Sequence, residues 1–277
     1  MNRWKRLMTL TAVLGLSIGL VACSDDDDDN GTNPPQDTAQ LRAVHASPDA
    51  PAVDIYVEGD NTPVATNVAY GDVTAYVTVP AGTYNVQLRP AGADSSTDPV
   101  FETGDVTLGA DVILTAVAAG LFSSTDPTNE FRIIPLFEDF ATPGPGNAIV
   151  RVLHASPDAP AVDIDVGNDG TSEVMDLARF ADTGAAGVDL PGGSPLAIGI
   201  LDDDTPFTSF TTPPLSAGTE YFLIATGLVG QTDLTADDAF VLLAVDESGS
   251  AAFIPQYGAD AGSAILRAVH ASPDAPT

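Results

Sequence analysis

Cysteine is almost absent from this chain of 277 residues, where Cys23 is the only one. A single cysteine excludes an intrachain disulfide framework and a cysteine-based zinc site. Aromatic residues are also scarce, at 6% of the chain, whereas there are 25 glycines and 22 prolines. This composition favours short strands joined by many turns over long helices.

Positive charge is the second scarcity. Nine Lys and Arg stand against 39 Asp and Glu, which gives a formal net charge of −30. Recognition of nucleic acid requires a basic surface that displaces counterions from phosphates. We therefore expect no nucleic-acid partner. The hydrophobic content of 44% is high enough for folded cores, so the acidity does not indicate wholesale disorder.

The first residues are typical of export. A basic start is followed by an apolar run over residues 7–22, which is too short for a comfortable membrane span. The run ends in Leu-Val-Ala-Cys, which resembles the bacterial lipobox, the site where a cysteine thiol receives diacylglycerol. We expect residues 1–22 to be a lipoprotein signal peptide and Cys23 to be the lipidation site, which would anchor the protein to a membrane. The alternative is an ordinary signal peptide with an incidental cysteine.

Residues 23–40 contain five consecutive aspartates and a pair of prolines, with almost nothing to bury. We expect a disordered acidic tether whose self-repulsion extends the chain. The run could instead collect calcium, although consecutive carboxylates without a fixed loop make a weak site. In enterobacterial lipoproteins, an aspartate directly after the cysteine is a signal for retention in the inner membrane. Ser24 occupies that position here, so we expect delivery to the outer membrane. Exposure at the cell surface is one possible outcome of that delivery.

The rest of the chain repeats itself. The segment LRAVHASPDAPAVDIYV starts at Leu41, VRVLHASPDAPAVDIDV starts at Val150, and LRAVHASPDAP starts at Leu266. Eleven residues, His45 to Ile55, recur without change at 154–164; we call these two stretches the signature. The interval between His45 and its repeat at 154 is about as long as one small domain. The predicted boundaries are a first domain at 41–140, a linker at 141–148, a second domain at 149–258, and a linker with a truncated third copy at 259–277.

Within each copy, β-branched segments alternate with turn residues about every ten positions. We expect strands at 53–57, 74–79, 84–88 and 112–117. This spacing predicts an all-β fold of tandem immunoglobulin-like antiparallel β-sandwich domains, each with seven or eight strands, after a signal peptide and a disordered acidic tether. The segment 172–181 fits either a short helix or a strand.

The signature contains the residue types of a hydrolase triad in His45, Ser47 and Asp49. A triad needs mutual geometry, and the prolines at 48 and 51 bend the segment. A turn explains the same residues more simply, because proline presets a dihedral angle and Ser or Asp caps nearby amides. We therefore favour a structural role and predict no catalytic residue.

A ligand or metal contact is the second reading of the signature. The residues concerned are His45, Asp49, Asp54, His154, Asp158 and Asp163. One histidine per domain would leave carboxylates to complete the set, which suits calcium only where loops converge. The acidic turns at 167–170 and 202–204 are further calcium candidates, and each is also typical of a solvated turn. We expect no cofactor, with calcium as the one alternative.

The signature, the later turn VPAGTYNVQL and the strand-like ILTAVA together resemble the bacterial domain-of-unknown-function family numbered 4397. This resemblance implies exported, often lipid-anchored envelope proteins with tandem β domains and no established activity, so it supplies no catalytic residue. The second copy has Asp165 where the first has Tyr56. If Tyr56 lies on a binding face, the second domain would not share that function.

These observations predict a lipid-anchored envelope protein that is not an enzyme, with β domains that act as spacer or interaction modules for a protein or glycan at the cell surface. A calcium-dependent adhesion or glycan-binding module is the alternative. A secreted hydrolase that uses His45 or His154 is the third possibility.

Overall fold

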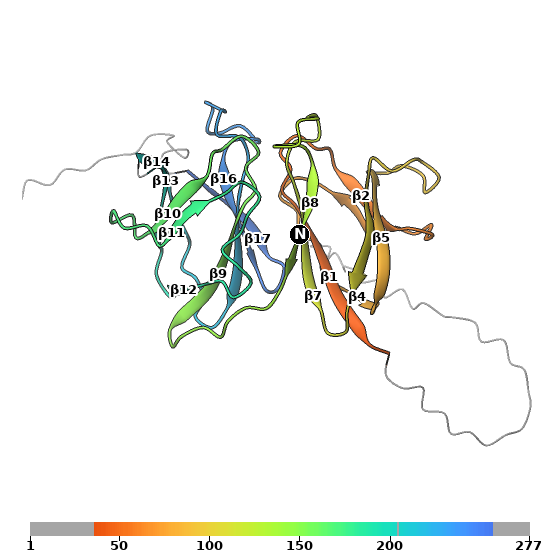
Figure 1. Ribbon diagram of the computed structural model, residues 1–277, viewed down its shortest axis with the longest axis horizontal. Coiled ribbons are helices and arrows are strands. Elements are labelled where there is room, and N and C mark those ends of the chain that lie inside the picture. Colours follow the sequence, from red (N-terminus) through yellow and green to blue (C-terminus); the bar gives the residue numbers. More distant parts are fainter. Residues whose placement is uncertain (1–35, 204, 257–277) are drawn as a thin grey trace, which may run out of the picture. The chain divides into compact units, whose positions relative to one another are not determined.

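The computed structural model describes residues 36–203 and 205–256, and every regular element in these ranges is a β-strand (Figure 1). The first sandwich comprises β1 (Thr38–His45), β2 (Val53–Val57), β3 (Ala65–Val68), β4 (Val77–Pro80), β5 (Gly82–Pro90), β6 (Phe101–Leu108), β7 (Ile113–Ala119) and β8 (Arg132–Phe137). The second comprises β9 (Asn147–His154), β10 (Val162–Val166), β11 (Val174–Leu177), β12 (Val188–Pro191), β13 (Ala197–Asp202), β14 (Thr205–Thr211), β15 (Glu220–Thr226), β16 (Val241–Asp246) and β17 (Ala251–Pro255).

These strands confirm the all-β prediction. The described residues contain no helix, and hence none that is long and apolar enough to cross a membrane. The segment 172–181 holds strand β11, which settles the choice between helix and strand. The predicted signal peptide, Cys23, most of the predicted tether and the predicted third copy lie outside the described residues.

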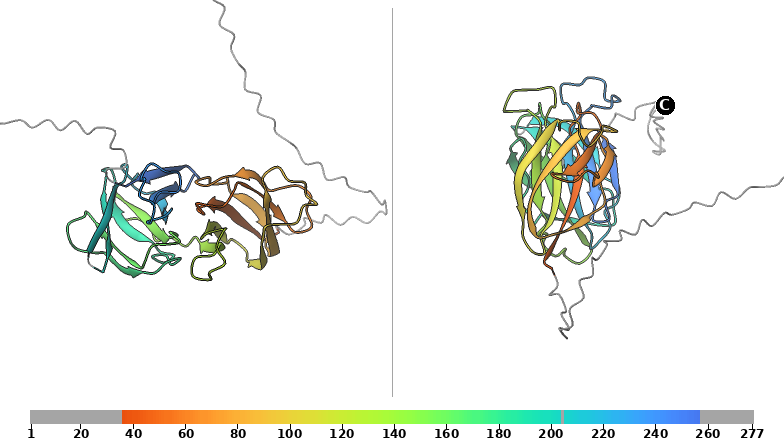
Figure 2. Two further views of the ribbon diagram at one scale, coloured as in Figure 1. Left: turned by 90° about the horizontal axis from the view of Figure 1, so that it is seen from above. Right: turned by 90° about the vertical axis from the view of Figure 1, so that its right-hand side faces the viewer.

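Each sandwich consists of two sheets. In the first, the strand orders are β4-β1-β7-β8 and β3-β2-β5-β6, and in the second they are β12-β9-β15-β16-β17 and β11-β10-β13-β14. Alternation places one set of side chains between the two sheets, as the burial of Val162 and Ile164 in β10 illustrates. The views in Figure 2 show the strands of each sandwich side by side in these layers.

The sequence predicted purely antiparallel pairing, and two pairs of strands correct this prediction. Strand β1 pairs with β7 in parallel, and β9 pairs with β15 in parallel. The signature causes this arrangement, because it carries the chain from the sheet of β1 directly into the sheet of β2. The neighbour of β1 therefore comes from much later in the sequence, after a long connection of the kind that a parallel pair requires.

Several element bounds also differ from the sequence prediction. Strand β1 begins at Thr38, within the segment assigned to the tether, and β4 is confined to Val77–Pro80 rather than 74–79. The second sandwich has nine strands, one more than the expected maximum. The additional strand is β17, which pairs with β16 at the edge of its sheet.

The two sandwiches share a buried hydrophobic cluster. The first contributes side chains such as Val44, Val117 and Leu136, and the second contributes Leu153, Phe222 and Ile224 among others. The outward faces of β1, β7 and β8 are therefore covered by side chains of β9, β15 and β16. Burial of this kind is the main favourable contribution to association of folded units.

Two arginines at equivalent positions make reciprocal contacts across this interface. Arg42 on β1 donates from Nη1 to the carbonyl oxygen of Asp246, the last residue of β16, at 2.9 Å. Arg151 on β9 donates from Nη1 to the carbonyl oxygen of Phe137, the last residue of β8, at 2.8 Å. Since β16 corresponds to β8, each sandwich contributes one arginine and one strand-end carbonyl oxygen to the interface.

Candidate functional site

The signature loop connects β1 to β2 at one end of the first sandwich, and His45 is the last residue of β1. The His45 side chain is 2% exposed, and its Nε2 lies 3.3 Å from the carbonyl oxygen of Pro51. Because a carbonyl only accepts, Nε2 carries the hydrogen and donates it. The imidazole thus ties the start of the loop to its end.

Ser47 and Asp49 tie the same loop to the turn that follows β7. The buried Ser47 hydroxyl donates to the carbonyl oxygen of Gly120 at 2.7 Å. The Asp49 carboxylate accepts hydrogen bonds from the backbone amides of Phe122 and Ser123, at 2.7 and 2.9 Å. Burial alone would raise the pKa of Asp49, but the hydrogen bonds from Ser123 and Phe122 outweigh it and lower the pKa below its usual value.

The second copy repeats this geometry. His154 donates from Nε2 to the carbonyl oxygen of Pro160 at 2.8 Å, and Ser156 donates to that of Gly227 at 2.7 Å. Asp158 accepts from the amides of Val229 and Gly230, both at 2.9 Å. Identical sequence therefore produces identical ties in both sandwiches.

The aspartate at the start of the following strand holds another loop. Asp54 is 5% exposed and accepts from the amides of Asn67 and Gly92, at 2.7 and 2.9 Å. Asn67 has a φ of 53°, a left-handed conformation that is uncommon outside glycine. In the second sandwich Asp163 accepts from Asp176, which also has a φ of 53°. Each carboxylate thus stabilises a strained turn.

These contacts bear on the triad hypothesis. Among the described residues, no hydrogen bond joins His45 to Ser47 or to Asp49. Ser47 Oγ lies 3.5 Å from Asp49 Oδ1, a long contact, and all three side chains bond to backbone groups. Burial lowers the pKa of both His45 and His154, so both imidazoles are neutral near pH 7. A neutral histidine that is held by a carbonyl is a structural tie in this geometry.

The six residues considered for metal binding do not converge within a sandwich. Over residues 36–203 and 205–256, no three His, Cys, Asp or Glu side chains are placed to hold one metal ion. The turn at 167–170 is held by Asp165, which accepts from the amides of Asp169 and Gly170 at 3.0 and 2.7 Å. In the turn at 202–204, Asp203 has a φ of 48°, and Asp204 lies outside the described residues.

Tyr56 does not lie on an open binding face. Its side chain is 3% exposed, and the guanidinium of Arg89 covers its ring at 4.6 Å. Asp165, its counterpart, is 2% exposed and is occupied by its own loop. The change from Tyr to Asp therefore alters how the outer face of one strand is covered, and it gives no reason to separate the functions of the two sandwiches.

A feature that the sequence did not suggest lies between the sheets of the first sandwich. A cavity of about 430 Å³ runs there, and its wall is almost entirely carbon. It separates the buried core into two clusters, one around Ile55 and Leu88 and the other around Leu108 and Leu114. At about 24 cal/mol per Å³, a dry void of this volume would cost about 10 kcal/mol, which is comparable to the whole stability of a typical domain.

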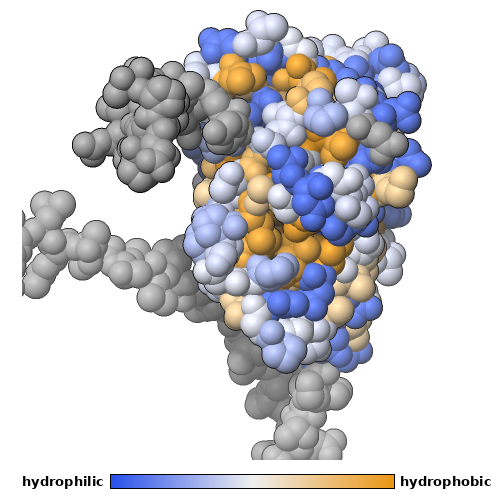
Figure 3. Space-filling view, turned by 90° about the vertical axis from the view of Figure 1, so that its left-hand side faces the viewer, coloured by the Kyte–Doolittle hydropathy of each residue, from blue (hydrophilic) through white to orange (hydrophobic). Residues whose placement is uncertain are grey.

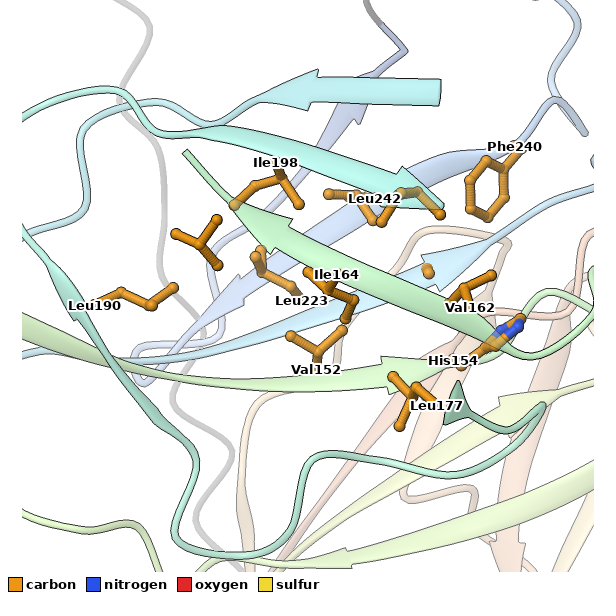
Figure 4. A pocket seen from close by; sticks show the side chains of 13 residues that line it. Val152, His154, Val162, Ile164, Leu177, Leu190, Ile198, Leu223, Phe240 and Leu242 are labelled. Atoms are coloured by element: carbon orange, nitrogen blue, oxygen red, sulfur yellow. The ribbon is translucent and has the colours of Figure 1, made fainter. Parts of the chain in front are cut away.

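The same space in the second sandwich is filled. The corresponding cavity there measures about 30 Å³. Figure 4 shows side chains from both sheets, among them Ile164, Leu223 and Leu242, directed toward one another in this space. The buried residues between the two sheets of this sandwich form a single cluster.

Two pairs of residues contribute to this contrast. At the centre of the parallel ladder, Ala43 pairs with Ala116 in the first sandwich, whereas Val152 pairs with Leu223 at the equivalent place in the second. Both alanines line the large cavity. An alignment of the two repeats could have shown that Ala43 and Ala116 replace larger residues. Only the register of β1 against β7 shows that these two alanines are neighbours.

The edges of the sandwiches also differ. In the first, β8 and β6 are edge strands, and the lining residues Pro135 and Phe137 are exposed on β8. In the second, β17 covers β16, and Gln256 bridges to Phe210 on β14, which joins the two sheets. The cavity of the first sandwich therefore reaches the surface at β8, while the second is closed at this edge.

The comparison with known families agrees with the resemblance found in the sequence. Residues 39–165 match the model of a family described as Domain of unknown function (DUF4397). The matched range covers the first sandwich from β1 onward and the first two strands of the second, up to Asp165. No curated protein matches the chain. The family resemblance is thus confirmed for residues 39–165.

Proposed function

We propose that this protein is a lipid-anchored component of the bacterial cell envelope, in which two β-sandwiches act as a non-enzymatic spacer or interaction module. The observation that carries the proposal is that the side chains of the signature bind loop backbone groups. The residues that most resemble a catalytic set, His45, Ser47 and Asp49, all hold loops in place, and their counterparts in the second sandwich do the same.

The interface between the sandwiches supports the spacer role. A spacer transmits distance only if its units do not swing freely, and a buried apolar contact between units restricts such motion. The shared cluster is reinforced by Thr226, whose hydroxyl donates to the carbonyl oxygen of Ala46 at 2.6 Å. We infer that the pair of sandwiches moves as one body.

The exposed apolar side chains support the interaction role. Met175 on β11 is 67% exposed, and Phe207 on β14 is 50% exposed. Figure 3 views the side where β10, β11, β13 and β14 lie, and hydrophobic residues gather there among hydrophilic ones. Aromatic residues and methionine are enriched where proteins contact partners. A protein or glycan partner at the outer membrane would meet such a face.

The anchor is tested by metabolic labelling with an alkyne-tagged fatty acid in a bacterium that processes lipoproteins. We expect label in the wild-type chain and none in Cys23→Ala, with Ser24→Ala as the matched control that retains it. Equal label in wild type and Cys23→Ala would overturn the anchor.

The interaction role is tested by pull-down from intact cells with the wild-type chain and with a Met175→Ser, Phe207→Ser variant. Partner recovery that depends on these two side chains is the expected result. Recovery, or a rise in melting temperature, that appears only when calcium is added would replace this proposal with a calcium-dependent adhesion module.

A further inference from the structure

We infer that the cavity of the first sandwich is a binding site for a single acyl chain whose headgroup carries no net negative charge. Its volume of about 430 Å³ lies within the range of roughly 300 to 1,000 Å³ that is usual for ligand sites. It is nearly three times the volume of an engineered cavity of about 150 Å³ that takes up benzene. The inference is independent of the anchor at Cys23.

The wall of the cavity selects an apolar ligand. Leu41, Leu114 and Ile55 are typical of the side chains that line it. The polar residues in the wall are already bonded to the backbone. Thr103 donates to the carbonyl oxygen of Gly104, and Arg132 donates to those of Glu130 and Pro127. A ligand with polar groups inside the cavity would lose its hydration without replacement partners.

His45 needs separate consideration because its Nδ1 has no hydrogen-bond partner in the described structure. The equivalent Nδ1 of His154 is also without a partner, although the cavity near His154 measures only about 30 Å³. The unpartnered nitrogen therefore belongs to the shared loop geometry. It is not a recognition element of the large cavity.

The shape of the cavity favours a linear ligand. On β1 the lining residues extend from Leu41 to His45, and on β7 they extend from Leu114 to Ala118. Four steps along a strand at about 3.3 Å each give a length of about 13 Å. The space follows the strands between the two sheets, so a chain of methylene groups fits its direction.

The residues around the opening of the cavity determine which headgroup charge is favoured. Pro135 and Phe137 on the edge strand β8 are exposed, so a polar headgroup would remain in water beside them. Asp139 follows this edge in sequence, and Glu102 and Asp105 are on the opposing edge strand β6, so the acidic side chains outnumber Arg132, the arginine of the cavity wall. Their field, added to a net charge of −30, disfavours an anionic headgroup.

The test uses the chain from Ser24 to Thr277, which retains every described residue. Titration calorimetry with monodecanoylglycerol below its micelle concentration should show one molecule bound per chain. Decanoate, which has the same chain length and a negative charge, should bind at least tenfold more weakly. No binding of monodecanoylglycerol would overturn the proposal, and equal affinity for decanoate would overturn the headgroup assignment.

A matched variant locates the site. The double substitution Ala43→Val, Ala116→Leu installs the residues of the second sandwich and narrows the cavity at the centre of the parallel ladder. Affinity for monodecanoylglycerol should fall at least tenfold while the melting temperature stays equal or rises. Leu223→Ala in the second sandwich is the control and should leave the affinity within twofold. Unchanged affinity in the double variant would place the ligand elsewhere and overturn the assignment.

A measurement on the unmodified chain guards against misfolding of the variant. With ¹³C-methyl alanine labelling, the methyl signals of Ala43 and Ala116 should show nuclear Overhauser contacts to the acyl protons of the ligand. Ala225, which lines the filled cavity of the second sandwich, supplies the internal control and should show none. Contacts at Ala225 without contacts at Ala116 would contradict the proposal.

Discussion

The two sandwiches have the same loop ties and different interiors. His45 and His154, Ser47 and Ser156, and Asp49 and Asp158 hold equivalent loops through corresponding backbone partners. Between the sheets, however, one sandwich encloses about 430 Å³ and the other about 30 Å³. These loop hydrogen bonds, which we call the frame, fix one end of each sandwich. The packing between the sheets can therefore differ between the two sandwiches.

The largest expected effect concerns the reciprocal arginines. Arg42 is 2% exposed and lies 3.7 Å from Glu138, whereas the partner of Arg151 is Asp182, whose side chain is 22% exposed. Arg42→Met should lower the free energy of unfolding by about 4 kcal/mol because it leaves a buried carboxylate unpaired. Arg151→Met should cost about 1 kcal/mol because Asp182 can regain water. Urea denaturation measures both, and equal losses would contradict the comparison.

The next largest effect is expected when a cavity is created between the sheets of the second sandwich. Leu223→Ala should lower the stability of the second sandwich by about 3 kcal/mol, since it removes buried methyl groups and leaves a void. Hydrogen exchange measured by mass spectrometry can follow peptides of β15 and β16 separately from those of the first sandwich. A loss below about 1 kcal/mol would indicate that this interior is not tightly packed.

The third effect is a pH dependence that both sandwiches should share. Burial lowers the pKa of His45 and His154, so the unfolded chain binds more protons than the folded one as the pH falls below about 6.5. Stability should therefore be full above this pH and should decrease by up to about 1.4 kcal/mol per pH unit for each histidine as the pH is lowered. Melting between pH 7.5 and 5.5 checks the sign. His154→Gln should halve the slope, and an unaltered slope would assign it to other groups.

A smaller effect has the opposite sign. Ala116→Leu places the side chain found at Leu223 into the large cavity and should raise the stability of the first sandwich by about 1 kcal/mol. In a filled interior the same change would lower stability by about 1 to 3 kcal/mol through overpacking. Calorimetric melting distinguishes the two outcomes. A decrease would mean that the cavity closes in solution.

The smallest effect tests whether the frames are equivalent. Ser47→Ala and Ser156→Ala each remove one hydroxyl that donates to a glycine carbonyl at 2.7 Å. Each should cost about 1 kcal/mol, because a buried carbonyl loses its partner. Chemical denaturation should give the same value for both within error. A difference above about 1 kcal/mol would show that the two frames are not interchangeable.

Local features of the fold were predictable from the sequence. Strand β2 spans Val53–Val57, as expected, because a short alternating run lies between clear turn residues. The expected strand at 84–88 lies inside β5, and that at 112–117 overlaps β7. These elements depend on nearby residues, which the sequence displays in order.

Non-local features were not predictable. The parallel ladder between β1 and β7 joins residues more than 70 positions apart, as Ala43 and Ala116 illustrate. The burial of Arg42 depends on a face that β1 presents to another repeat, and nothing in the neighbouring residues indicates it. The cavity arises from volumes summed across two sheets. Such quantities require the register of strands, which a single sequence does not contain.

The reciprocal contacts of Arg42 and Arg151 have a consequence for how copies of this domain can be counted. Each copy gives its arginine and receives the other's at the end of its last equivalent strand. Such a self-complementary contact is isologous, and it closes after two members, unlike a head-to-tail contact, which would extend without limit. Copies that assemble in this way do so in couples. A chain with an odd number of copies would present one unmatched arginine face, and the natural complement of that face is an identical face on a second molecule.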